Sequence, residues 1–488
     1  MTAPIVKPLP YDNTNPDSIL KYAQFLKWKT FWEVLEKDPN LTKEQKEIIK
    51  ENYDRPKNKS RFWDFIQENF FYIDRNSDSN ADLNKAWVEL KVSPYIKWAK
   101  WRIRAKERMV LTKINYMNDY NIEFEKSHLL EKCGLMLLIY YFYDKNKYDE
   151  DYLINYVDLF QFPEDDYEII KKDYYTILNK IKEWKAHEIS EWDTIYLWAC
   201  TKAADSSVKT EQPFSDVLAK PRAFSLKNSY MTIVLNEYLA KNIHTYKQKS
   251  DEIKSQLEQL KKDVITYWKA ITDKNALKEE WFENYIISKM RQYYWKNVDD
   301  LLKMFDIDSK SKSKYYMLAK KMLWVNEDKI EEFEKANIEI KTIRLKSNGT
   351  PKEAMSFPAF EYMKIINQDY YDSELYDLLS ESKFLFMIFK YKDKKLKDLV
   401  FEKAMFWNTP WIDLEWKIKT AWEETRFRIR WWEYDNLIKM KDNMIIHVRP
   451  HAKNKADTFK TPNGWEATKK CFRFNPRYIK EQIEKWGN

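Results

Sequence analysis

Apolar residues recur along the first half of the chain with two different periods. In Ser18–Lys37 they return every three or four residues, which is the spacing of one helix face, at Leu20, Ala23, Leu26 and Phe31. The same period predicts further helices over Leu41–Asn52, Ser60–Phe71 and Asp165–Ala186. Alternating or continuous apolar runs predict strands over Ala86–Val92, Arg108–Ile114, Leu135–Tyr143, Ile154–Phe160 and Asp193–Cys200, and Arg222–Leu239 predicts a strand followed by a helix. We therefore predict an α+β (mixed α/β) fold, with a mixed central sheet flanked by helices.

Three segments of the first half recur in the second half, in the same order and at a nearly constant offset. The pairs are Trp28–Leu35 with Trp295–Leu302, Asp82–Lys91 with Glu332–Lys341, and Phe224–Val234 with Phe472–Gln482. The Lys- and Glu-rich stretch Tyr246–Ile271 predicts a connecting helix with a solvated face. We therefore predict a first domain over residues 1–245, a helical connector over 246–284 and a second, duplicated domain over 285–488.

Composition narrows the class of protein. The 488 residues suffice for two or three domains, and contents of 44% apolar and 33% charged residues predict a soluble globular protein. We expect a cytoplasmic protein, because its three scattered cysteines suggest a reducing compartment. We expect no membrane partner, because the sequence shows no run of eighteen apolar residues and no N-terminal signal segment. Three widely spaced cysteines and five histidines argue against a disulfide framework and against a Cys- or His-rich metal centre. The net charge of +8 permits a polyanion partner without establishing one.

Glycine is unusually rare in this chain and tryptophan unusually common. An average protein of this length has about 7% glycine, or roughly 34 residues, to serve turns with positive φ. This chain has 4 glycines and 21 tryptophans. Tryptophan stands in the turn-like segments Ser190–Thr194, Phe406–Asp413 and Arg430–Asn436. Two interpretations are open: a tryptophan-rich core, or a source that decodes UGA as glycine and a translation that wrote it as tryptophan.

One short segment has the spacing of a metal-dependent nuclease site. Glu89 and Lys91 are two residues apart in a predicted strand, so their side chains share one face, and Asp82 lies at the approach to that strand. Carboxylates that hold Mg²⁺ help to neutralise the charge building on a phosphate, and a nearby lysine can orient or deprotonate the attacking water. Glu68, on the preceding helix, is a further candidate carboxylate. The alternative is that Glu-x-Lys arises by chance as solvated charges on a strand face.

A resemblance to a known family favours the nuclease. The segments that carry it are DLNKAWVELKVSP (Asp82–Pro94), RAKERMVL (Arg104–Leu111), SHLLEK (Ser127–Lys132), KAHEISE (Lys185–Glu191), ACTKAADSS (Ala199–Ser207) and RAFSLKNSYMTIVL (Arg222–Leu235). Together they resemble the type II restriction endonucleases related to the mismatch-repair nickase MutH. The likeness covers essentially the whole chain, because the members that cut at GATC also carry a second MutH-like domain, whose landmark here is Ile445–Asp457.

The resemblance implies an activity with a cofactor and partners. It implies two restriction-endonuclease-like domains and a type II site-specific deoxyribonuclease that needs Mg²⁺, cuts double-stranded DNA at GATC and belongs to a restriction–modification system. A cognate DNA methyltransferase is then expected in the same system. A dimer or loop formed on DNA through the second domain is also expected. The alternatives are a MutH-type mismatch-repair nickase, which needs a single such domain, and a non-catalytic DNA-binding protein.

The resemblance also assigns roles to residues. The family's Asp-x6-Glu-x-Lys falls on Asp82, Glu89 and Lys91, and its second catalytic lysine falls on Lys132. Asp82 and Glu89 would hold the metal together with the helix glutamate, which falls on Glu68 or, with a shift of one residue, on Gln67. The expected DNA-binding residues are Lys202, Arg222 and Lys227, in the segments Ala199–Asp205 and Arg222–Asn228, and Arg449 and Lys453 in the second domain. Whether Arg222 and Lys227 contact bases or only phosphates stays open.

The second domain departs from the family pattern at its metal-binding positions. Glu332 replaces the aspartate, whereas Glu339 and Lys341 persist, and Lys320 and Lys321 lie where the helix carboxylate is expected. The resemblance therefore implies a second domain that binds DNA and does not cut it.

The resemblance also bears on the tryptophans. Glycine is common in the family at the positions of Trp28, Trp32, Trp63 and Trp87, so we predict that UGA codons encode these four residues.

Overall fold

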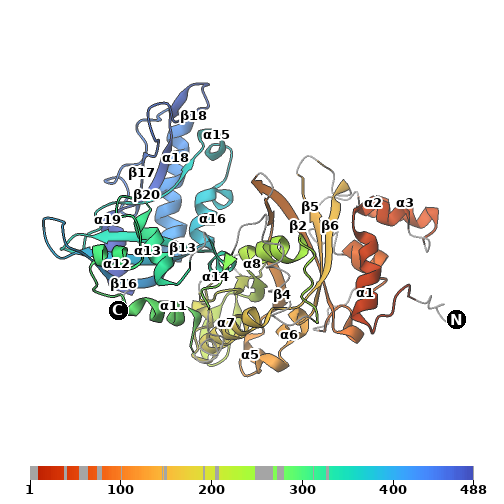
Figure 1. Ribbon diagram of the computed structural model, residues 1–488. Coiled ribbons are helices and arrows are strands. Elements are labelled where there is room, and N and C mark those ends of the chain that lie inside the picture. The colour runs from red at the N-terminus through yellow and green to blue at the C-terminus, as the bar shows by residue number, and fades with distance from the viewer. Residues whose placement is uncertain are drawn as a thin grey trace. The chain divides into compact units, whose positions relative to one another are not determined.

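The computed structural model describes residues 9–37, 41–53, 64–73, 80–99, 102–144, 147, 151–190, 193–203, 208–247, 267–271, 280–311, 313–325 and 329–486. The chain divides into two compact units, of which unit 1 is Met1–Thr266 with Glu334–Ala336 and unit 2 is Tyr267–Phe333 with Asn337–Asn488. Figure 1 labels many of the elements of each unit. Most of the expected connector helix lies outside the described residues. The prediction that this helix continues to Ile271 is wrong, because Tyr267–Trp268 forms a short strand, β11.

The main sheet of unit 1 carries the segment with Glu89 and Lys91. Its strand order is β1-β6-β5-β2-β3, and the strands are β1 (Lys29–Thr30), β2 (Glu89–Ala99), β3 (Arg102–Ala105), β5 (Met136–Phe142) and β6 (Leu153–Phe160). β2 runs parallel to β5, and β5 runs antiparallel to β6 (Figure 1). The central strand β5 is apolar throughout and buried along nearly all of its length, as is typical of a strand covered on both faces.

A smaller sheet and a set of helices complete unit 1. The sheet has the order β4-β10-β7, with β4 (Met109–Lys113), β7 (Leu197–Thr201) and β10 (Arg222–Leu226). The helices are α1 (Pro16–Ala23), α2 (Phe31–Glu36), α3 (Lys43–Tyr53), α5 (Tyr116–Asp119), α6 (His128–Cys133), α7 (Glu164–Lys182), α8 (Asn228–Ile233) and a π-helical turn, η2 (Ile66–Phe70). Strands and helices alternate without segregating, so the mixed α+β fold expected from the sequence is confirmed.

Several expected element boundaries in unit 1 are wrong: the strand predicted from Asp193 begins only at Leu197, and two other boundaries fail for a shared reason. The single helix predicted over Ser18–Lys37 breaks, because Trp28 adopts φ of 64° and Thr30 then caps α2 through a reciprocal bond with Glu33. The strand predicted from Ala86 begins only at Glu89, after a 3₁₀ turn and Trp87 at φ of 56°. The apolar periodicity continues across both breaks, so it could not reveal a left-handed residue.

Unit 2 repeats the topology of unit 1. β13 (Ile338–Leu345) is parallel to β15 (Lys383–Tyr391), which is antiparallel to β16 (Leu399–Trp407), as β2, β5 and β6 are in unit 1. Its second sheet, in the order β14 (Met355–Phe360), β20 (Lys470–Phe474) and β17 (Ile446–Pro450), matches β4-β10-β7. Its main helices are α11 (Phe282–Arg291), α12 (Val298–Met304), α13 (Lys314–Met322), α16 (Glu374–Glu381), α18 (Lys419–Arg430) and α19 (Pro476–Trp486). The helix α14 (Glu331–Ala336) begins in unit 2, and its last three residues belong to unit 1.

Several tryptophans lie at backbone positions that suit glycine. Among the described residues, positive φ is found at Trp28, Trp87, Trp184, Trp295, Trp324 and Trp432, and each of these is more than half exposed. Trp184, Trp324 and Trp432 directly follow the C-caps of α7, α13 and α18. After α7, Trp184 N–H donates to Ile181 O at 3.1 Å and Lys185 N–H to Lys180 O at 2.8 Å. This Schellman pattern, which also follows α13 and α18, normally has glycine at the left-handed position.

Other tryptophans belong to the core. Trp198, Trp407 and Trp422 are buried, and the Trp407 indole N–H donates to Gln482 Oε1 at 3.1 Å. Their volume fills the core and their backbone is regular, so nothing at these positions favours glycine. Trp32 lies in α2 with ordinary helical backbone, and Trp63 lies outside the described residues.

Candidate active site

A tight turn brings Asp82 to Glu89 at the start of β2. Leu83 and Val88 exchange backbone hydrogen bonds of 2.9 and 3.3 Å, and the left-handed residue 87 reverses the chain between them. Across this turn, Asp82 N–H donates to Glu89 Oε2 at 3.3 Å, and Leu90 N–H donates to Asp82 Oδ2 at 3.1 Å. The six-residue gap in the motif is therefore closed by local backbone geometry.

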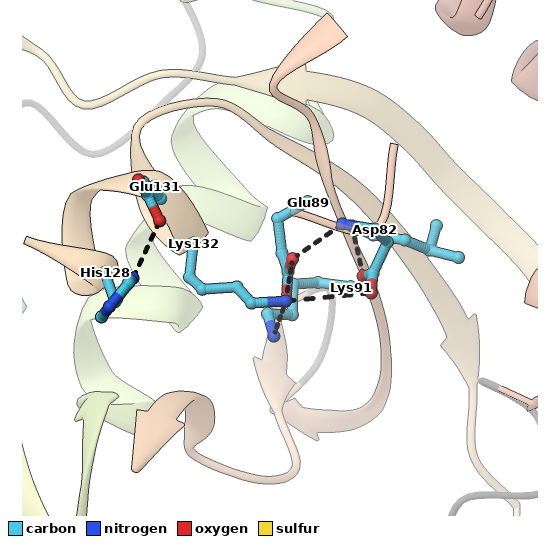
Figure 2. A network of polar contacts seen from close by, with 7 residues as sticks. Asp82, Glu89, Lys91, His128, Glu131 and Lys132 are labelled. Atoms are coloured by element: carbon cyan, nitrogen blue, oxygen red, sulfur yellow. Dashed lines mark hydrogen bonds and ion pairs between the residues drawn. The ribbon is translucent and has the colours of Figure 1, made fainter. Parts of the chain in front are cut away.

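Two lysines complete the cluster from different elements. Lys91 follows Glu89 on the same face of β2, and its Nζ lies 2.9 Å from Glu89 Oε1. Lys132 comes from α6, whose first turn is capped by the Ser127 hydroxyl. Its Nζ lies 3.0 Å from Glu89 Oε2 and 4.0 Å from Asp82 Oδ1 (Figure 2). The fold thus brings together all four residues that the sequence assigned to catalysis.

The electrostatics of the cluster suit a divalent cation. Burial, reinforced by the Glu89 charge, raises the pKa of Asp82 to about 6, although both lysines oppose this shift. The Lys132 ammonium lies where the two carboxylates converge, so a cation is already favoured at that point. In the described part of the chain, no third acidic, His or Cys side chain joins them. Two carboxylates, completed by water and phosphate oxygens, are a donor set typical of Mg²⁺.

The helix position favours Gln67 over the expected Glu68. Glu68 lies on the exposed side of η2, whereas Gln67 is fully buried, and neither its amide oxygen nor its amide nitrogen has a hydrogen-bond partner. A π-helical turn holds one extra residue, so it shifts by one position the side chain that faces inward. The structure therefore places Gln67, and not Glu68, on the buried side of this turn.

The matching position in unit 2 lacks this arrangement. Glu332, at the place of Asp82, is buried and accepts hydrogen bonds from the N–H groups of Ala270 and Ile271 at 2.9 and 3.1 Å. Burial, reinforced by Glu331, raises the pKa of Glu332 to about 7. Glu339 and Lys341 still form an ion pair of 2.8 Å.

The lysine that α6 contributes in unit 1 has no counterpart at the matching position of unit 2. Ser373 caps α16 with the same two hydrogen bonds that Ser127 makes at α6. Counting from this shared cap, Leu378 occupies the place of Lys132. Unit 2 therefore keeps the Glu-x-Lys pair but has lost the other two members of the cluster.

Comparison with known proteins agrees with this geometry. The family of the DNA mismatch repair enzyme MutH matches residues 71–173 and 322–420, which include β2, β5 and β6 and then β13, β15 and β16. The type II restriction enzyme Sau3AI of Staphylococcus aureus is 32% identical over 468 residues, which cover 86% of this chain and 91% of that enzyme. The chain belongs to the MutH-related type II restriction enzymes. It is therefore a site-specific deoxyribonuclease with a duplicated MutH-like architecture.

The expected DNA-binding residues of this restriction enzyme differ in accessibility. Lys202 is exposed directly after β7, and Arg222 is half-buried, with one guanidinium nitrogen donating to Ala199 O. The expectation that Lys227 binds DNA is not supported, because its side chain is only 2% exposed and its Nζ lies 4.9 Å from the centre of the Trp198 ring. A lysine so enclosed is not available to DNA. In unit 2, Arg449 and Lys453 are exposed. Residues 204 and 205 of the expected DNA-binding segment Ala199–Asp205 lie outside the described residues.

Two features of the restriction enzyme were not singled out in its sequence. His128 lies one helical turn before Lys132 and contacts Glu131 at 3.0 Å, on the side of Lys132 away from the carboxylates (Figure 2). Asp173 is a buried carboxylate in α7. Its signal was present in the sequence, since it falls on the apolar stripe with Ile169 and Ile177, where a charged residue needs a specific partner.

Proposed function

We propose that this restriction enzyme requires Mg²⁺ and cleaves double-stranded DNA at GATC, within a restriction–modification system that includes a cognate DNA methyltransferase. The observation that carries the proposal is the convergence of Asp82, Glu89, Lys91 and Lys132 at one buried point. The GATC sequence comes from the resemblance to family members that cut there, as set out above. Buried, unpaired Cys133, Cys200 and Cys471 are compatible with the cytoplasm as its compartment.

Asp82 and Glu89 would hold the Mg²⁺, with the Gln67 amide oxygen as a neutral helper. Bound there, the ion supplies positive charge to the phosphodiester and acidifies water at the site. The chain's own residues do the positioning. Lys91, which lies beside Glu89 on the same face of β2, would orient the attacking water. Lys132 remains on the opposite side of Glu89, where its charge can stabilise the phosphate as negative charge develops.

Unit 2 is proposed to bind DNA without cutting it and to support a dimer or a loop on DNA. The support is the loss of two members of the cluster, since Glu332 serves backbone amides and Leu378 replaces the lysine. Exposed Arg449 and Lys453 are suited to phosphate contacts.

The test is cleavage of supercoiled plasmids that carry two, one or no GATC sites. With Mg²⁺ we expect linear fragments with ends at the GATC sites, no cutting of the plasmid without sites, and no cutting with EDTA. Faster cutting of the two-site plasmid would support looping. Open-circular product alone would indicate a nickase, and retarded migration without cleavage would indicate a non-catalytic DNA-binding protein. Equal cutting of all three plasmids would refute the proposed specificity.

A further inference from the structure

Asp173 holds three consecutive backbone amides in unit 1. Its side chain is buried in α7, and its carboxylate accepts hydrogen bonds from the N–H groups of Ile195, Tyr196 and Leu197 at 2.8, 2.6 and 2.9 Å. Leu197 is the first residue of β7, so these bonds fix the point where that strand begins. A buried carboxylate with three amide donors is a directional anchor that an apolar contact cannot replace.

The strand held by Asp173, β7, leads directly to the two segments expected to bind DNA, Ala199–Asp205 and Arg222–Asn228. β7 pairs with β10 from Leu197↔Leu226 to Thr201↔Arg222. Beyond this ladder, Lys202 N–H donates to Pro221 O at 2.9 Å, so the ends of the two segments are joined. A shift at the start of β7 is therefore transmitted along the ladder to both Lys202 and Arg222.

The second expected DNA-binding segment, Arg222–Asn228, is also linked near its C-terminal end to the backbone that Asp173 holds. Lys227 N–H donates to Tyr196 O at 3.1 Å, next to an amide that Asp173 holds. Burial raises the pKa of Asp173, and the three amides and the Lys227 charge oppose this shift. The amide hydrogen bonds and the Lys227 charge thus favour the carboxylate form, which accepts all three bonds. This also gives enclosed Lys227 a role as the electrostatic partner of Asp173.

We propose that Asp173 is a positioning residue for sequence recognition: by holding the start of β7, it sets where Lys202 and Arg222 meet DNA. The proposal rests on the proposed function, because it takes these segments as the ones that read the site. It assigns no contact with DNA to Asp173 itself.

The test compares Asp173→Asn with Asp158→Asn in the full chain. Asp158 is a matched control, since it is also buried, accepts one backbone N–H from Leu159 and lies on β6, outside the β4-β10-β7 sheet. Cleavage is measured at GATC and at sites with one base changed. For Asp173→Asn we expect the ratio of the two kcat/KM values to fall about tenfold or more, since a misplaced base contact costs discrimination. For Asp158→Asn we expect that ratio to stay at the wild-type value, whatever the melting temperature does.

A merely structural role would lower cleavage of both kinds of site by one common factor. An unchanged ratio for folded Asp173→Asn would therefore overturn the proposal. If that variant does not fold, hydrogen exchange in the wild-type protein decides: we expect slow exchange of the Ile195, Tyr196 and Leu197 amides, and fast exchange would overturn the anchor. If the wild type cuts a different sequence, the ratio is measured there. If it cuts no DNA, the proposed function has failed, and the exchange experiment still tests the anchor separately.

Discussion

Trp87 and Asn337 occupy the same turn in the two repeats, two residues before Glu89 and Glu339, and both are left-handed, with φ of 56° and 52°. Asparagine tolerates this conformation well, whereas a bulky side chain rarely adopts it. Trp87 is 62% exposed, so packing does little to offset the strain. The pair shows that the turn itself demands a left-handed residue, for which glycine is the usual choice.

We predict that glycine at Trp28, Trp87, Trp184, Trp295, Trp324 and Trp432 stabilises the protein, by about 1–2 kcal/mol per position. The coding DNA should show UGA at these positions, as expected also for Trp32 and Trp63. Thermal melting of the two versions checks the stability, and Trp407→Gly is the control, which should destabilise because it empties the core. UGG codons at all these positions, or equal melting temperatures, would contradict the prediction.

Replacing Lys91 with alanine should abolish cleavage and leave specific DNA binding nearly unchanged. Lys91 contacts Glu89 at 2.9 Å and is expected to act on the attacking water, which contributes little to binding affinity. Single-turnover cleavage and gel-shift assays with Mg²⁺ and Ca²⁺ measure the two effects. Lys85→Ala is a matched control, since Lys85 is an exposed lysine in the same turn, and it should cut normally. Near wild-type cleavage by Lys91→Ala would exclude the assigned role.

Asp82→Asn should make the metal-free protein more stable at pH 7.5 and change it little near pH 4. The pKa of Asp82 is raised from 3.8 to about 6 on folding, so the folded state binds the extra proton between these values, and stability falls as pH rises through that window. Removing the charge should recover up to about 3 kcal/mol above pH 6, at about 1.4 kcal/mol per pKa unit. Melting temperatures across pH 4–8 in EDTA provide the measurement. A variant less stable than wild type at pH 7.5 would mean that the two lysines stabilise the Asp82 charge by more than burial destabilises it.

Single variants of Gln67 and Glu68 should show which of the two side chains contributes to Mg²⁺ binding. We expect Glu68→Gln to keep the Mg²⁺ concentration for half-maximal cleavage, because Glu68 is exposed. Gln67→Ala should raise that concentration, and Gln67→Glu should lower it, since a carboxylate binds Mg²⁺ more strongly than an amide does. Mg²⁺-induced shifts in melting temperature give a second readout that does not depend on activity. A loss of Mg²⁺ response in Glu68→Gln alone would restore the original assignment.

The double variant Glu339→Ala, Lys341→Ala should cut DNA at the wild-type rate. These residues keep the ion pair of the family motif, but Glu332 is committed to the Ala270 and Ile271 amides and cannot join them. Cleavage of the two-site plasmid by the full chain is the measurement, and Glu89→Ala, Lys91→Ala is the control that should be inactive. A strong loss of cutting in the unit 2 variant would indicate a second working site.

Much of this protein was determined by its sequence. Apolar periodicity located β4, β5, β6 and α7 within a few residues, because burial of one face or of a whole strand leaves its period in the chain. The spacing of Asp82, Glu89 and Lys91, together with the family resemblance, predicted a catalytic cluster, and the fold brings these side chains together with Lys132. The low glycine content predicted that tryptophans stand at positions that suit glycine, and six tryptophans in the described part of the chain have positive φ.

Other features were decided by tertiary structure alone. The left-handed backbone at Trp28 ended a helix that the periodicity continued, because a backbone conformation leaves no trace in hydrophobicity. In the π-helical turn Gln67 is buried and Glu68 is exposed, a difference that no pattern of charges encodes. Lys227 looked like a DNA contact in sequence, yet it is enclosed beside Trp198, because the ladder of β7 and β10 and the buried Asp173 charge bring it inside. Such outcomes depend on which long-range neighbours share a low-dielectric interior, and that is fixed only when the chain has folded.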